Sequence, residues 1–172
     1  MLFDLDWSYG YQRTRLGPAD PNTYKGNTLT HAMGTNRLHI GLMLRKFFEN
    51  TRFKTEFINR FADYLNTVFH SDRVHSLIAK TQENLESEMP NHYNRFKTAP
   101  ITEWYKQITI MENFATYRPF YIREHIRNYF GLAETVQVNV QNIPAKSGRT
   151  KINHIQIFAS VYLEKDVFRR ND

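Results

Sequence analysis

A long stretch with almost no glycine, residues 36–131, constrains the fold of this chain more than any other feature of its sequence. Gly41 is the one glycine within it before Gly131. Apolar side chains recur there at spacings of three and four residues, most regularly at Phe53, Phe57, Phe61, Leu65 and Val68. Since that spacing places them on one face of a helix, the pattern predicts about five helices over residues 36–131.

Residues with strong preferences for helix ends divide this stretch. Candidate N-terminal caps precede three of the expected helices, at Asn36, at Asn50 or Thr51, and at Ser71 with Asp72 in the first turn. We expect Pro90 to stop the third helix, Pro100 to open a later one, and Pro119 to kink or restart it. Gly131 is expected to terminate the last helix.

The two ends of the chain differ from the helical stretch. Residues 1–35 are rich in glycine and proline and predict loops, apart from a short strand at the start, where apolar and acidic residues alternate. After Gly131 the period falls to two, which predicts strands. We therefore expect a mainly α fold with a short N-terminal strand and a small C-terminal β segment. Residues 1–131 would form one domain, and residues 132–172 the beginning of a β-rich module, either truncated or docked on the helices.

The composition is that of a globular protein, with 41% hydrophobic and 23% charged residues in a chain of 172. The absence of cysteine excludes disulfides and cysteine zinc sites. No apolar run approaches the roughly 20 residues of a membrane-spanning helix, so no membrane span is expected. The net charge of +6 is spread thinly along the chain, whereas nucleic-acid binders concentrate positive charge in a stripe. We therefore expect no nucleic-acid partner.

One pair of acidic residues is placed like a chemical site. Asp4 and Asp6 flank Leu5 and share one side of the expected first strand, which puts their carboxylates roughly 6–7 Å apart. Two carboxylates at that separation suit shared binding of Mg²⁺, which prefers carboxylate and phosphate oxygens. The alternative is a pair of solvated carboxylates on an edge strand, and the motif alone leaves both interpretations open.

The segment Leu2–Gly10 resembles the aspartate-rich motif of the CotH kinase family, the spore-coat-protein-H-like atypical protein kinases, whose members carry a WDLDW-S/T-F-G type sequence. Four further segments are similar to family motifs: Asn27–Leu29, Phe53–Asn66, Arg73–Val74 and Glu88–Phe96. In the last of them, Phe96 stands where the family has tryptophan. Together these segments span about residues 1–130. A weaker similarity links Gly148–Asn153 to β modules that follow this domain in secreted members.

The resemblance implies the helical C-terminal lobe of a protein-kinase-like fold. In the family, the aspartate motif takes the place of the metal-binding aspartate of ordinary kinases, a role that falls here to Asp6 or Asp4, with Asp6 slightly favoured. It implies Mg²⁺ and ATP as cofactors, and transfer of the γ-phosphoryl group to a serine or threonine of a protein substrate, such as a coat or surface protein. It also suggests a spore coat, cell envelope or secreted location.

Other parts of a kinase are expected to lie outside this chain. The family places its phosphate-covering loop, its lysine and its catalytic base before the aspartate motif, and only three residues precede Asp4. We therefore expect these 172 residues to be a fragment of a larger kinase, or a truncated reading frame, that is inactive alone.

Three alternatives remain beside the kinase interpretation: a phosphatase, a histidine metal site and a non-enzymatic scaffold. A phosphatase of the haloacid dehalogenase type also opens with a strand and two aspartates, but Trp7-Ser8-Tyr9 replaces its next motif. A histidine metal site is disfavoured, because no pair of histidines has the spacing of a zinc helix. Arg118 and Arg123 are expected on a solvated face, or else in a basic spot near the site. The stronger alternative is a non-enzymatic helical scaffold that serves in surface or spore-coat assembly.

Overall fold

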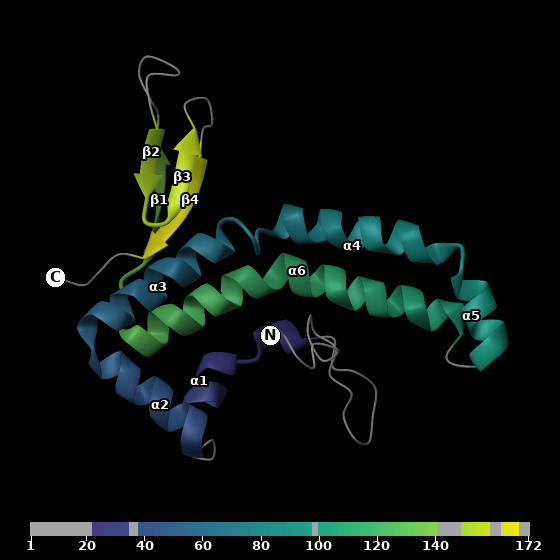
Figure 1. Ribbon diagram of the computed structural model, residues 1–172, viewed down its shortest axis with the longest axis horizontal. Helices are drawn as coiled ribbons and strands as arrows, with labels where there is room; N and C mark the ends of the chain where they lie inside the picture. Colours follow the sequence, from purple (N-terminus) through teal and green to yellow (C-terminus); the bar gives the residue numbers. More distant parts are fainter. Residues whose placement is uncertain (1–21, 35–37, 98–99, 141–148, 159–162, 169–172) are drawn as a thin grey trace. The chain divides into compact units, whose positions relative to one another are not determined.

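The computed structural model describes residues 22–34, 38–97, 100–140, 149–158 and 163–168. Within them the chain is mainly helical with small β segments near its C-terminal end, which confirms the expected fold class (Figure 1). The strand expected at the start of the chain lies outside the described residues. The helical elements are η1 (Thr23–Lys25), α1 (Thr28–Met33), α2 (Leu38–Glu49), α3 (Thr51–Leu65), α4 (Ser71–Glu86), α5 (Met89–Phe96) and α6 (Ile101–Phe130).

The elements belong to two compact units. Unit 1 contains η1, α4, α5 and residues 101–121 of α6, and unit 2 contains α1, α2, α3, the end of α6 and all of the strands. Helix α6 is the longest element, and it contributes residues to both units because the division falls after Tyr121.

Unit 1 is built on an apolar contact between α4 and α6, which lie side by side (Figure 1). The buried residues of this core are Val74, Ile78, Ile108 and Ala115, with Trp104 and Met111 packed against them. These residues lie four apart on α4 and three or four apart on α6, which gives one apolar face per helix, as the sequence predicts. Trp104 is therefore a packing residue of unit 1.

Pro119 lies inside α6, which continues through it rather than restarting. A proline has no N–H, so the carbonyl four residues earlier, that of Ala115, loses its partner within the helix. The hydroxyl of Ser71 donates to this carbonyl over 2.9 Å, from the first residue of α4. Ala115 is itself buried, at 4% exposed, and therefore has little access to water as a substitute partner. Ser71 thus replaces the hydrogen bond that Pro119 removes.

The same observation corrects the prediction that Ser71 caps α4. The residue before the helix is His70, and it makes no capping bond with its side chain. Ser71 is instead the first helical residue, and its hydroxyl is directed to α6. Pro90 likewise lies in the first turn of α5, while α4 ends earlier, at Glu86.

Unit 2 has a separate core of Ile58, Leu65, Ile122 and Ile126. Ile126 is fully buried at 0% exposed. Aromatic rings extend this core, since Phe48 lies edge-on to Phe57 at 4.9 Å and to Phe130 at 5.0 Å between ring centroids. Rings in such edge-to-face pairs attract one another beyond the effect of area burial. Phe57 and Phe61 of the predicted stripe thus pack against this core, whereas Phe53, at the start of the stripe, is 38% exposed.

Gly41, the one interior glycine of the helical stretch, marks a close approach between α2 and the end of α1. A Cβ atom at this position would come within 2.8 Å of the Gly34 carbonyl oxygen and 3.0 Å of the Ala32 carbonyl oxygen. No side chain fits at those distances without moving backbone, so glycine is required there for steric reasons.

Two predicted helix ends are confirmed. The side chain of Asn50 caps α3 by accepting from the backbone N–H of Phe53 at 3.0 Å. Gly131 follows α6 with φ +62°, and the N–H of Leu132 donates to the Arg127 carbonyl, which is the Schellman arrangement. Helix α1 was not predicted. Asn27 caps it by accepting from the N–H of Thr30.

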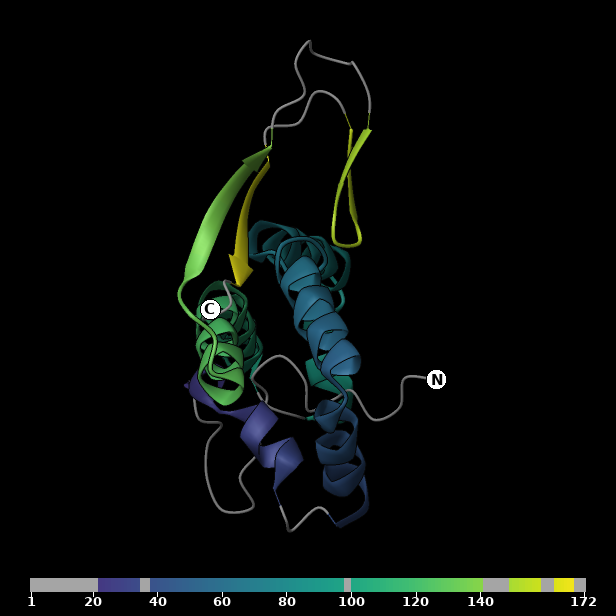
Figure 2. The ribbon, with the colours of Figure 1, turned by 90° about the vertical axis from the view of Figure 1, so that its left-hand side faces the viewer.

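The strands form two separate antiparallel pairs (Figure 2). Strand β1 (Thr135–Val140) pairs with β4 (Leu163–Phe168), and β2 (Arg149–Ile152) pairs with β3 (Ile155–Phe158). In the second pair Ile152 lies opposite Ile155, so Asn153 and His154 alone form the turn. Asn153 has φ 49°, a conformation that asparagine tolerates better than most residues.

The contact between Ser71 and Ala115 is testable with a double-mutant cycle. We expect Ser71→Ala to lower the free energy of unfolding by about 1–2 kcal/mol, because a buried carbonyl loses its partner. In a Pro119→Ala background the same change should cost less, since the restored N–H satisfies that carbonyl. Urea denaturation of the four proteins measures the coupling. Ser76→Ala, at an exposed serine of α4, is the matched control, and zero coupling would refute the account.

Candidate functional site

Asp4 and Asp6 lie outside the described residues, so the expected magnesium site stays a prediction. Among the residues that the structure describes, the buried charged side chain is that of Asp63, at 5% exposed. It lies in α3, inside the segment Phe53–Asn66 that resembles a family motif. Glu56, Arg60 and Asp63 follow one another at spacings of four and three residues, which places all three on one face of the helix.

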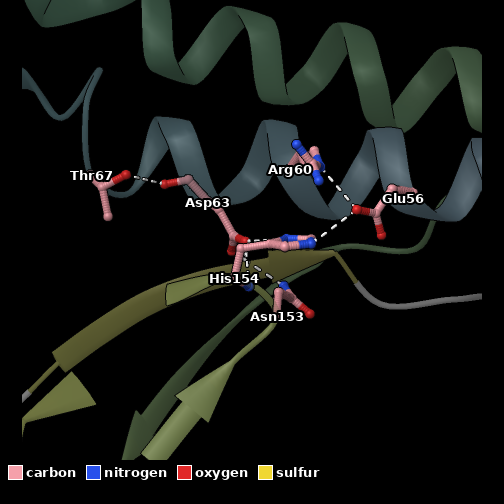
Figure 3. Close-up of polar contacts among 6 residues, drawn as sticks. All are labelled: Glu56, Arg60, Asp63, Thr67, Asn153 and His154. Carbon is pink, nitrogen blue, oxygen red and sulfur yellow. Dashed lines mark hydrogen bonds and ion pairs between the residues drawn. The ribbon is translucent and has the colours of Figure 1, made fainter. Parts of the chain in front are cut away.

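The Asp63 carboxylate holds the turn of the β2–β3 hairpin (Figure 3). Its Oδ2 accepts from the backbone N–H of His154 at 2.9 Å and lies 3.1 Å from Nδ1 of the same residue. Its Oδ1 accepts from the Asn153 amide at 3.3 Å. A buried carboxylate is costly unless hydrogen bonds replace its hydration, and these three contacts do so.

A second carboxylate approaches the other side of the His154 ring. Nε2 lies 2.9 Å from Glu56 Oε1, and the same oxygen accepts from Arg60 Nε at 2.9 Å. The hydrogen bond from Arg60 is the main reason that the pKa of Glu56 lies below its usual value, and the charges of His154 and Arg60 add to it. Figure 3 shows the imidazole lying between Asp63 and Glu56.

Chemically this array is a carboxylate–imidazole–carboxylate chain that joins a hairpin turn to a helix. A shallow pocket of about 530 Å³ on the same face of α3 is lined mainly by aromatic rings, together with Glu56 and Arg60, which are bonded to each other. In the described part of the chain, no group of three or more histidine, aspartate or glutamate side chains is arranged to hold a metal ion. The hydrogen bonds from Asn153 and His154 to Asp63 make the array an anchor for the hairpin turn.

Other positions in the family-like segment of α3 also have structural roles. Ala62 and Leu65 are buried at 4% each, and Leu65 belongs to the unit 2 core. Asn66 ends the helix and accepts from Arg123 Nη2 through its side-chain oxygen at 3.0 Å. The motif resemblance along α3 thus coincides with residues that pack and anchor unit 2.

The two arginines considered as a basic spot are used in internal contacts. Arg118 Nη1 donates to the carbonyl oxygens of Tyr24 and Gly26, at 2.8 and 2.6 Å. Partial burial lowers the pKa of this guanidinium from its usual value. Arg123 donates to Asn66, and both arginines are half-buried, so each makes internal contacts while keeping part of its surface in solvent.

An apolar groove of about 350 Å³ runs between α4 and α6 in unit 1. Its lining consists of Val74, Leu77, Ile78, Thr81, Gln82, Leu85, Trp104, Ile108 and Met111. Two leucines on its α4 side, Leu77 and Leu85, are about half exposed. Apart from Thr81 and Gln82 the described lining is apolar, so the groove offers mainly apolar contact surface.

Sequence reasoning did not find the network around Asp63. Its partners lie 90 and 91 residues away along the chain, so no local pattern joins them. One signal was available: an aspartate stands between the apolar residues Phe61, Ala62 and Leu65, where burial without a partner would be costly.

Removal of the Asp63 carboxylate should destabilise unit 2. We expect Asp63→Ala to lower the free energy of unfolding by about 1–3 kcal/mol, because the donors of the hairpin turn lose their acceptor. Asp72→Ala is the control, since that side chain is 92% exposed and its loss should cost well under about 1 kcal/mol. Chemical denaturation followed by circular dichroism measures both. Equal effects of the two changes would show that Asp63 is no anchor.

Every helix in the described part of the chain is too short or too polar to span a bilayer, in agreement with the sequence.

The chain was compared with known proteins by sequence and by structure. Searches of curated proteins and of solved structures gave no significant match. Residues 1–122 match the family model described as CotH kinase protein, which covers the aspartate motif and the helical stretch through most of α6. The chain therefore belongs to the CotH kinase family.

Proposed function

We propose that this chain carries the metal-binding segment of a protein kinase that uses Mg²⁺ and ATP. The observation that supports the proposal is the family match over residues 1–122, which starts at the chain's first residue and includes Asp4-Leu5-Asp6. The similarity extends well beyond a short acidic motif, since it runs through α1 to α5 and into α6.

The chemistry of the two aspartates fits phosphoryl transfer. Mg²⁺ keeps several water ligands and is bound in proteins by one or two carboxylates together with phosphate oxygens. Asp6 and Asp4 would hold the ion against the phosphates of ATP, with Asp6 as the principal ligand. The ion would then offset the negative charge that develops as the γ-phosphoryl group moves to the acceptor.

The acceptor in this proposal is a serine or threonine hydroxyl of a coat or surface protein. The bond between the γ-phosphorus and the bridging oxygen of ATP breaks, a bond to the hydroxyl oxygen forms, and ADP leaves. The hydroxyl proton passes to a base or to solvent. In this proposal the helical part of the chain forms the scaffold that carries the aspartate segment.

Substitution of the aspartates tests the proposal. In the protein as its gene encodes it, we expect Asp6→Asn to lower phosphate transfer from ATP by about 100-fold or more, because transition-state charge loses its counterion. Asp4→Asn should have a smaller effect. Transfer of labelled γ-phosphate to a protein substrate is measured at several Mg²⁺ concentrations. Asp72→Asn, in an exposed position of α4, is the matched control and should retain full activity.

Two results would contradict the proposal. Activity of the double variant Asp4→Asn/Asp6→Asn at the level of the control would remove the aspartates from catalysis. A folded protein that neither transfers phosphate nor binds Mg²⁺ with ATP would favour the alternative function, a non-enzymatic scaffold in surface or spore-coat assembly.

A further inference from the structure

Both nitrogens of the His154 ring face carboxylate oxygens, so the number of hydrogen bonds that the ring donates depends on the number of protons it carries. Nδ1 lies 3.1 Å from Asp63 Oδ2, and Nε2 lies 2.9 Å from Glu56 Oε1. A neutral imidazole has one N–H, so it donates to one of these oxygens and turns a lone pair toward the other. The imidazolium form donates to both. The full set of contacts is therefore that of the protonated ring.

We propose that the β2–β3 hairpin is a pH-sensitive latch, which the protonated His154 ring holds on α3 and which loosens when the ring loses its proton. Imidazole is the side-chain group that gains and loses a proton near neutral pH, so a contact that needs its charged form is open to control by pH. This inference concerns unit 2 alone and does not depend on the proposed kinase function.

The charged groups around the ring agree with this proposal. Helix α3 presents two carboxylates to the imidazole, those of Asp63 and Glu56, while its nearby cation, Arg60, bonds to Glu56. On the hairpin itself, Lys151 is exposed and the other turn residue, Asn153, is neutral. Strand β4 also packs against α3, and its side chains are outside the described set. Two anions and no cation thus contact the ring directly among the described side chains.

Loss of the ring proton would loosen the latch without detaching it. One of the two ring contacts would be lost, and a lone pair would then face a carboxylate. Asp63 would still accept from the backbone N–H of His154 and from Asn153. Since the His154 side chain is 39% exposed, the surrounding water weakens the effect and a modest change is expected.

Hydrogen exchange of the complete chain tests the latch. Protection factors for amides in residues 149–158, corrected for the intrinsic pH dependence of exchange, are measured at pH 5.5 and 8.0. We expect wild-type protection to fall by roughly threefold to tenfold as the pH rises, the equivalent of one charged hydrogen bond with partial solvent screening. Amides of α4, in unit 1, serve as the internal reference and should not change.

Two variants separate the latch from general instability. His154→Gln should show the same protection at both pH values, because the ionisable ring is gone. Glu56→Gln should also lose the pH dependence, since the glutamine amide can donate to Nε2 of the neutral ring while Nδ1–H donates to Asp63. His92→Gln, at an exposed histidine of α5, should retain the full wild-type response.

The results that would overturn the latch are equally specific. Constant wild-type protection between the two pH values would refute it, as would a pH dependence that survives in His154→Gln. Nitrogen chemical shifts of the imidazole give an independent reading. Both ring nitrogens of His154 should carry protons at pH 5.5, and a neutral single tautomer at that pH would contradict the proposal.

Discussion

Helix α6 supplies buried residues to both hydrophobic cores, and a hydrogen bond from outside the helix compensates for the proline in its interior. Pro119 removes the intrahelical partner of the Ala115 carbonyl, and the Ser71 hydroxyl supplies another at 2.9 Å. The same contact fixes the start of α4 against α6 within unit 1. Before Pro119 in the sequence, the helix packs on α4 through Ile108. After Pro119, Ile122 and Ile126 belong to the core of unit 2. An interior proline is thereby compatible with a helix of 30 residues.

Unit 2 depends in a similar way on a buried polar group with partners from distant parts of the chain. Asp63 would destabilise α3 if it were buried alone, but the hairpin turn provides donors for both of its oxygens. The turn gains its position from the same contacts. A two-stranded hairpin is marginally stable in water, and the bonds to α3 give β2 and β3 a support that their own pairing lacks.

The parts of the fold that sequence predicted correctly are those decided by neighbouring residues. The phenylalanine stripe of α3, the cap at Asn50 and the terminator at Gly131 each follow from residues within one or two helical turns. The role of Ser71 could not be predicted, because the carbonyl that it satisfies lies 44 residues away. The partners of Asp63 are more distant still, at 90 and 91 residues. The aspartate motif was found from sequence, and it lies outside the described residues.

The family match covers both the aspartate motif and the helical stretch, and the proposed function assigns metal binding to the motif. The most direct test of that assignment is the nuclear magnetic resonance spectrum of the protein, as its gene encodes it, in the presence of ATP and Mn²⁺, a paramagnetic substitute for Mg²⁺. If Asp4 and Asp6 bind the metal, the resonances of residues 3–8 will broaden first, and only when ATP is present. Unchanged resonances there, with broadening elsewhere or nowhere, would contradict the assignment of the metal site.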